Sequence, residues 1–247
     1  EFRRVLFRST FNDTTYAALA LRLVDGTVPA ATVAAIRAAE HPDGGWDYTG
    51  DLSTGTPEDI NTTAAAIIGL VAGGATQSDD GVQRALGYLA VHQQPDGGWR
   101  EDGDAVTNPN ATALAVLAIR TAGYDPDAGA WRPALPAGAA SLTAVTGTPT
   151  DALLAAQADD GHLVGPYDDF GLNTFGTAQG VHGLLRNWLV GALPLAVPTT
   201  TTTSTTAPPS TTSAAAPSRL ANSGARDTGP TVVLGVVAIG LGLGLVA

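Results

Sequence analysis

One turn sequence occurs twice in this chain and returns a third time in altered form. Residues 41–46 read HPDGGW and residues 94–99 read QPDGGW, whereas residues 157–162 read QADDGH, with His162 expected at the place of the tryptophan. Proline ends a helix, and a glycine pair permits a sharp reversal of the backbone. Each copy therefore predicts a helix followed by a turn that packs its tryptophan back onto that helix. We assign this structural role to Trp46, Gln93, Gly97, Gly98 and Trp99.

A second series of residues marks the starts of apolar helices. Thr63, Thr112 and Thr177 each follow a polar residue by four positions, and a weaker copy ends at Thr15. The polar residues are Asp59, Asn108 and Asn173. Side chains of this kind accept hydrogen bonds from the free amides of a helix N-terminus. A spacing of about 50 residues, with one enlarged unit, predicts a repeat protein whose units bury their faces against neighbours.

Each repeat is predicted to be a helical hairpin. Residues 64–71 are apolar nearly all round, as in a covered inner helix, and residues 82–91 alternate polar and apolar faces, as in an outer helix. Prolines around Trp131 interrupt the pattern between residues 123 and 148. The expected helices cover residues 13–24, 30–40, a hairpin from 59 to 93, 110–122, 151–157 and 174–193. The predicted fold class is all-α.

The second turn and the helix before it resemble a known motif. The residues that carry the resemblance are Arg84, Ala85, Tyr88, Leu89, Gln93, Gly97 and Trp99. Their spacing is similar to the QW motif of the prenyltransferase and squalene-cyclase repeat family. The resemblance covers about residues 11–192 and implies part of an α/α toroid, with inner and outer helices and an N-terminal truncation, over residues 10–197. This toroid serves terpenoid cyclases, protein prenyltransferases, thioester proteins and cobalamin carriers, so the resemblance implies a fold and leaves the activity open.

The composition excludes several kinds of partner and site. Residues 1–9 resemble a translated sequencing adapter and are set apart from the fold. The net charge of −11 argues against nucleic acid as a partner. The chain has no cysteine, which excludes disulfides, thiolate metal sites and a cysteine nucleophile. Its four histidines are scattered, and we expect no metal site.

Residues 59–64, read DINTTA, align with the acid motif DxDDTA of squalene–hopene cyclases. In that family the central aspartic acid protonates an alkene, whereas here Asn61 has an amide that cannot supply the proton. Zinc-dependent prenyltransferases and thioester proteins need a cysteine that this chain lacks. We therefore expect no catalytic residue and no cofactor, although the resemblance allows a cobalamin-like ligand.

Candidate ligand-binding residues lie at the starts of the inner helices. They are Asp59, Asn61, Asn108, Asn110 and Asn173. If these helices run side by side, their N-termini gather at one rim, where partial positive charge collects. The predicted ligand is a small molecule that is anionic or bears an amide.

The C-terminal part has a different composition. Residues 198–219 are almost entirely Thr, Ser, Ala and Pro, which predicts either a plain linker or an extended stalk. The pentapeptide that follows resembles the LPxTG sorting signal in its LAxTG form. Its residues are Leu220, Ala221, Asn222, Ser223 and Gly224. The resemblance implies a sortase and peptidoglycan as partners, with the uncharged residues 231–247 in the membrane; the alternative is a simple transmembrane anchor.

Two functions of different classes follow. The first is a non-catalytic toroid, anchored in the cell wall or membrane, that binds a ligand or a surface partner. The second is a degenerate or incomplete terpenoid cyclase of the squalene type. Residues 220–247 are expected to form the sorting-like signal and membrane segment, and either kind of anchor would hold the domain outside the cell. The stalk and the signal favour the binding protein, because a cyclase acts on membrane substrates and these segments display the domain away from the membrane.

Overall fold

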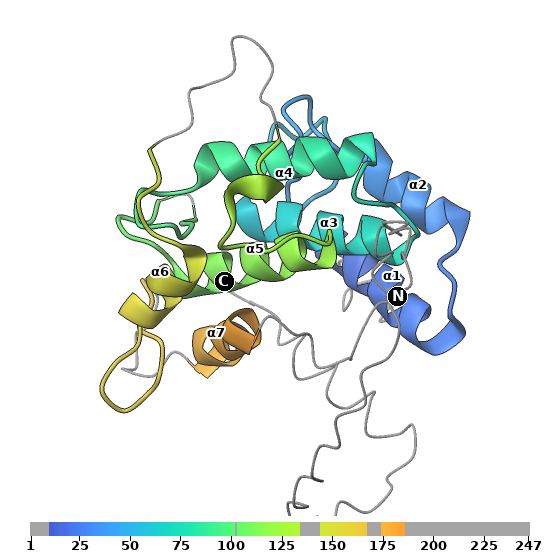
Figure 1. Cartoon of the computed structure of the whole chain (residues 1–247). Coiled ribbons are helices and arrows are strands. Elements are labelled where there is room, and N and C mark those ends of the chain that lie inside the picture. Colours follow the sequence, from blue (N-terminus) through green and yellow to red (C-terminus); the bar gives the residue numbers. More distant parts are fainter. Residues whose placement is uncertain (1–9, 102, 134–143, 167–173, 186–247) are drawn as a thin grey trace, which may run out of the picture. The chain divides into compact units, whose positions relative to one another are not determined.

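The computed structural model describes residues 10–101, 103–133, 144–166 and 174–185, and these form helices joined by loops and turns (Figure 1). The α-helices are α1 (Phe11–Asp25), α2 (Ala30–Ala38), α3 (Ile60–Ala72), α4 (Asp80–His92), α5 (Pro109–Thr121), α6 (Pro149–Ala155) and α7 (Thr174–Leu185). A 3-10 turn, η1 (Gly129–Trp131), follows α5. No strand occurs in these described ranges, where only two isolated bridges are present. The all-α fold class predicted from the sequence is confirmed.

The helices form two layers. The odd-numbered helices are neighbours in the order α1, α3, α5 and α7, and we call them the inner layer. The even-numbered helices cover this layer: α2 packs on α1 and α3, α4 packs on α3, and α6 packs on α5 and α7 (Figure 1). This arrangement is the one expected of hairpin repeats. Closure into a toroid stays a prediction.

Helices α3 and α5 are covered on nearly every side because their residues are small and apolar. Ala64, Ala66, Ile67 and Leu70 of α3 have no exposed surface. Small residues bring the backbones close, and a β-carbon at Gly69 would approach the Cα atom of Thr15 in α1 to 3.3 Å. Outer helix α4 instead buries one face only, so the sequence difference between residues 64–71 and 82–91 reflects the two layers.

The two GGW turns have the same geometry. The indole Nε1 of Trp46 donates to the carbonyl oxygen of Ile36 at 2.7 Å, and Nε1 of Trp99 donates to that of Leu89 at 2.8 Å. Both tryptophans are fully buried. Gln93 donates through Nε2 to the carbonyl oxygen of Gly97 at 2.7 Å. The predicted packing of tryptophan on the preceding helix is thus present in both turns.

Gly97 occupies a position that only glycine fits. Its φ is +95°, and a β-carbon there would lie 2.4 Å from the carbonyl carbon of Thr148. The Gly98 that follows leaves no room either, because its β-carbon would meet Thr107 at 2.3 Å. The turn is therefore pressed against the start of α6, and the glycine pair permits this approach.

The third turn differs from the prediction by one residue. Gly161 has a φ of +93° and corresponds to Gly97, and the amide of His162 donates to Asp160 Oδ1 as the amide of Gly98 does to Asp96 Oδ1. His162 therefore takes the place of the second glycine. Leu163, 2 % exposed, takes the place of the tryptophan. The expectation for His162 is wrong because Gln157 matches Gln93 and not Gln94: its Nε2 donates to the carbonyl oxygen of Gly161, as Gln93 Nε2 does to that of Gly97.

The enlarged unit contains a third packed tryptophan. Trp131 of η1 is buried, its ring lies 5.9 Å from that of Trp99, and its Nε1 donates to the carbonyl oxygen of Pro126 at 3.0 Å. Arg132 stacks over the Trp131 ring and donates through Nε to Gln93 Oε1 at 3.1 Å. The insertion is thus tied to the second turn by Trp131 and Arg132.

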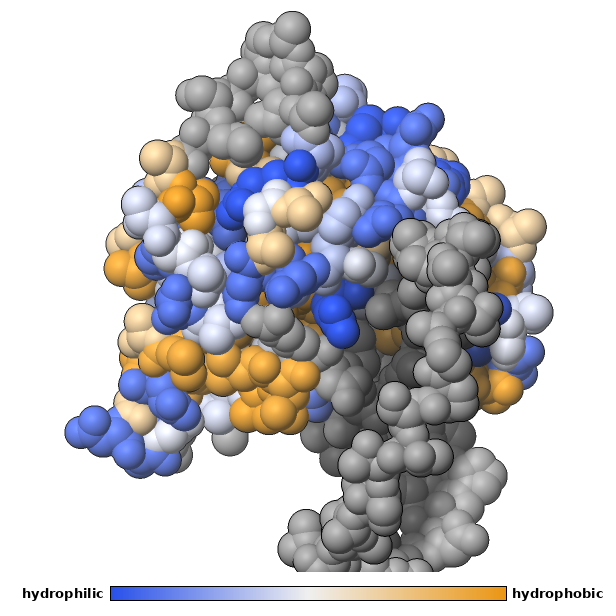
Figure 2. Space-filling model, viewed as in Figure 1, coloured by the Kyte–Doolittle hydropathy of each residue, from blue (hydrophilic) through white to orange (hydrophobic). Residues whose placement is uncertain are grey.

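Helix α7 leaves apolar side chains exposed at the end of the inner layer. Val181 and Leu185 are 46 % and 68 % exposed, and an apolar surface covers this region in Figure 2. Within the described residues no helix is both long and apolar enough to cross a bilayer. The stalk, the sorting-like residues Leu220 to Gly224 and residues 231–247 lie outside the described residues.

Candidate functional site

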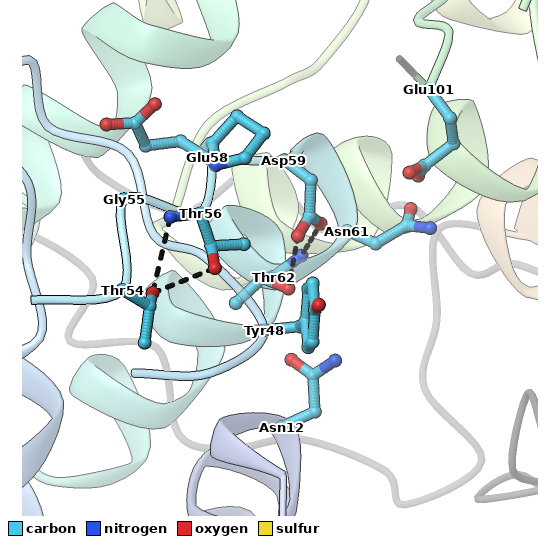
Figure 3. Close-up of a pocket in the computed structure, with 11 residues that line it drawn as sticks. Asn12, Tyr48, Thr54, Gly55, Thr56, Glu58, Asp59, Asn61, Thr62 and Glu101 are labelled. Carbon is cyan, nitrogen blue, oxygen red and sulfur yellow. Dashed lines mark hydrogen bonds between the residues drawn. The ribbon is translucent and has the colours of Figure 1, made fainter. Parts of the chain in front are cut away.

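A pocket of about 550 Å³ lies where α1 and α3 begin (Figure 3). Helix α1 contributes Asn12, helix α3 contributes Asn61 and Thr62, and Glu101 comes from the loop after the second GGW turn. Tyr48 and residues 54–59 complete the lining from the loop between α2 and α3. The amide of Phe11 donates to the Tyr48 carbonyl oxygen at 3.0 Å, which holds this loop against the start of α1. The pocket is therefore built by the N-terminal ends of two inner helices and the two loops beside them.

Asp59 is held firmly in the pocket wall. Its Oδ1 accepts from the Thr62 amide at 2.6 Å, and its Oδ2 accepts from the Thr62 hydroxyl at 2.8 Å. Its own amide donates to the carbonyl oxygen of Trp46 at 3.0 Å, so the turn and the helix start are joined. Burial raises the pKa of the Asp59 carboxyl, although the bonds from Thr62 oppose this effect. Burial, together with the Asp59 charge, raises the pKa of Tyr16 to about 12, so this phenol stays neutral.

Two amide oxygens of the lining have no hydrogen-bond partner among the described residues. They are Oδ1 of Asn12 and Oδ1 of Asn61, and both are buried. In Figure 3 the Asn61 amide points toward the Glu101 carboxylate across the pocket. A buried acceptor without a partner costs free energy that a water or a ligand donor can recover.

The charge of the lining is negative. Glu58, Asp59 and Glu101 contribute carboxylates, and no arginine or lysine is among the described residues that line the pocket. Asp59 already caps α3, so its charge faces the partial positive charge of that helix end. The sequence-based expectation of an anionic ligand is not supported by this lining, because the helix end is neutralised by the protein's own carboxylate.

A second layer of charge lies behind Glu58. His41 Nδ1 is 2.6 Å from Glu58 Oε1, and His41 Nε2 is 2.6 Å from Asp47 Oδ2. The Asp47 side chain is fully buried and also accepts from the amides of Thr49 and Gly50 at 2.7 and 3.2 Å. Burial alone would raise the pKa of Asp47, but the bonds from Thr49, His41 and Gly50 outweigh it and lower the pKa. His41 therefore links the first GGW turn to the pocket wall.

The structure brings together only part of the predicted site. Asp59 and Asn61 line the pocket, whereas Asn108 and Asn110 do not. Asn108 is 3 % exposed, accepts from the Asn110 amide at 2.9 Å and donates to Asp104 Oδ2 at 2.9 Å. It is a helix cap whose partners are all internal. Asn173 lies outside the described residues.

Several pocket residues were not predicted. Asn12 lies in the first turn of α1, the helix of the weakest repeat copy. The prediction that inner-helix starts form the site could therefore have included it. Glu58 lies in a loop, and Glu101 belongs to the next repeat. No local pattern marks these two, because their meeting depends on how the two loops fold over the helix ends.

The pocket offers hydrogen-bond acceptors and hydroxyls together with apolar surface, to which Pro57 and the Tyr48 ring contribute. Asn61 occupies the position that resembles the proton donor of the cyclase motif, and an amide does not protonate an alkene. In the described part of the chain, no three His, Asp or Glu side chains are grouped to hold a metal ion.

These observations define the class as an all-α helical-repeat protein with a polar pocket at the N-terminal ends of its inner helices. The chain is 36 % identical over 105 residues to a drimenyl diphosphate synthase of Streptomyces showdoensis, a terpene synthase. The match covers 38 % of this chain and 19 % of the length of that protein. No family model matches the chain. The partial similarity supports a relationship to terpenoid cyclases.

Proposed function

We propose that residues 10–197 form a non-catalytic ligand-binding domain related to terpenoid cyclases and displayed at the cell surface. The observation that carries the proposal is the pocket with Asn61 in its wall. The pocket has the size of a small-molecule site, and an amide stands where the related motif has its acid. A pocket of this size that lacks the proton donor is suited to binding.

The surface location is part of the proposal. It rests on the composition of residues 198–219, on the sorting-like residues Leu220 to Gly224 and on the uncharged residues 231–247. A sortase would join the chain to peptidoglycan, and a retained membrane segment is the alternative anchor. We expect Leu220→Ala and Gly224→Ala to move the protein from the wall fraction to the membrane fraction. If the variants fractionate like the parent, the sorting signal is excluded and residues 231–247 act only as a membrane anchor.

The binding function is tested with a panel of small molecules. Thermal unfolding of the full chain is followed with uncharged, cationic and anionic compounds, and at least one should raise the Tm, because a ligand that binds the native state stabilises it. Asn61→Ala should reduce that rise, and Asn110→Ala, outside the pocket, should retain it. If no compound raises the Tm, the ligand-binding proposal is wrong.

A second candidate is a degenerate or incomplete terpenoid cyclase. It is favoured by the similarity to a terpene synthase and by the raised pKa of Asp59, since a buried carboxylic acid can donate a proton. The native chain and Asn61→Asp are incubated with squalene and with farnesyl diphosphate, and products are analysed by gas chromatography. We expect no cyclic product from either protein, because Thr62 occupies the next position of the acid motif. A product from the native chain would establish the cyclase.

A further inference from the structure

The acceptors of the pocket define what a ligand must supply. Carboxylates accept hydrogen bonds and cannot donate them, and three stand in this wall. An anion would meet only like charge here, and an apolar molecule would remove water from these groups without replacing its hydrogen bonds. A fitting ligand therefore carries several O–H or N–H donors and no negative charge.

Tyr48 adds an apolar face to this wall. The residue is 55 % exposed, although its backbone carbonyl oxygen accepts a hydrogen bond from the start of α1. A tyrosine ring offers a flat apolar surface at low entropic cost. A ring-shaped ligand with C–H groups on one side and hydroxyls at its edge can lie on Tyr48 and still reach the carboxylates.

The wall is organised before any ligand arrives. Thr54 Oγ1 is 2.8 Å from Thr56 Oγ1 and donates to the Asp51 carbonyl oxygen at 2.9 Å. Asp59 is fixed by Thr62, and Glu58 by His41. Groups that are already placed lose little freedom on binding. In contrast, the buried oxygens of Asn12 and Asn61 lack a partner and would gain one from a ligand donor.

We propose that this pocket binds a saccharide, with its ring on Tyr48 and its free hydroxyl or amino groups directed to Glu58, Asp59 and Glu101. The inference rests on the proposed binding function and adds the chemical class of the ligand. The volume of about 550 Å³ is ample for one sugar ring and falls within the range of roughly 300–1,000 Å³ of small-molecule sites.

Saturation-transfer NMR and calorimetry on the full chain, in buffer free of glycoside detergents, test the proposal. The probes are glucose, galactose, N-acetylglucosamine, glucosamine and the β-1,4-linked dimers of glucose and N-acetylglucosamine. At least one should bind, and Tyr48→Ala should weaken it by about tenfold, the upper range for one aromatic contact. Tyr48→Phe should retain binding, since it keeps the ring. Glu101→Gln should weaken binding, and Asp25→Asn, which removes an exposed charge outside the pocket, should not.

The Glu101→Gln variant distinguishes an amino sugar with an ammonium group from a neutral sugar. If Glu101→Gln weakens glucosamine more than glucose, the ammonium form is preferred, and an equal loss indicates neutral hydroxyls. Either result supports the saccharide. Sugar binding that is unchanged in both Tyr48→Ala and Glu101→Gln would place it elsewhere and overturn the proposal.

Failure of this proposal can be told apart from failure of the binding function. If no sugar binds but farnesyl diphosphate does, and Asn61→Ala removes that binding, the saccharide is excluded and the pocket remains a ligand site. If neither the sugars nor farnesyl diphosphate nor any compound of the thermal panel binds, both proposals are wrong.

Discussion

Thr177 Oγ1 accepts a hydrogen bond from the backbone amide of Leu163 at 2.8 Å. The same bond joins the Trp46 amide to Thr63 Oγ1 and the Trp99 amide to Thr112 Oγ1, both at 3.0 Å. The threonines of α3, α5 and α7 thus each fix the turn that precedes their helix. This bond shows that the third turn is equivalent to the two GGW turns, although it has no tryptophan.

The bond to Thr112 is expected to contribute to stability. Thr112→Val keeps the shape but leaves the buried Trp99 amide without an acceptor, at a cost of about 1–3 kcal/mol. Thr76→Val, on an exposed loop, is the control and should change the free energy of unfolding little. Urea denaturation of both variants measures the difference. Equal costs would show that the Thr112 bond is not stabilising.

Trp99 is expected to be a structural residue. Trp99→Ala removes a fully buried side chain that packs on Trp131, and the expected cost is about 3–5 kcal/mol. In a repeat fold the loss should spread to both neighbouring units, which hydrogen exchange can locate. An unchanged Tm together with lost ligand binding would instead make Trp99 a site residue.

A pair of glycine variants separates steric contact from backbone strain. Gly97 and Gly103 have φ of +95° and +91°, but a β-carbon at Gly103 would meet no atom within 4 Å. Gly103→Ala should cost only the left-handed strain of about 1–2 kcal/mol. Gly97→Ala should cost clearly more, because its β-carbon would overlap Thr148. Chemical denaturation compares them, and equal losses would contradict the close approach.

Asp59 is expected to make stability depend on pH. Its pKa is raised in the folded protein, so the native state binds a proton more readily than the unfolded chain. The contribution of Asp59 is therefore most favourable near and below the ordinary value of 3.8, and it falls as the pH rises through the raised pKa. Relative to Asp59→Asn, the native chain should lose stability with rising pH across this window. Thermal unfolding of both proteins between acidic and neutral pH measures the difference, and parallel profiles would contradict the raised pKa.

The sequence by itself determined the helices and their order. Prolines, glycine pairs and capping residues act within a few positions along the chain, so α1, α2, α5 and the outer ends of the hairpin of α3 and α4 were found close to their observed bounds. The roles of Trp46 and Trp99 followed from the same local chemistry, because each packs on the helix that directly precedes it. The repeat period also indicated that the inner helices are neighbours.

The tertiary structure decided the site and its charge. Asn12 comes from the weakest repeat copy, whereas Tyr48 and Glu101 come from two loops, and only folding of these loops over the helix ends brings the three together. Asn61 and Asn110 hold matching places in their repeats, yet only Asn61 lines the pocket. The alignment of the third turn was likewise decided by backbone geometry, which assigns Leu163 in place of His162. Local sequence specifies where a helix begins, but which helix ends share a cavity depends on contacts between residues far apart in the chain.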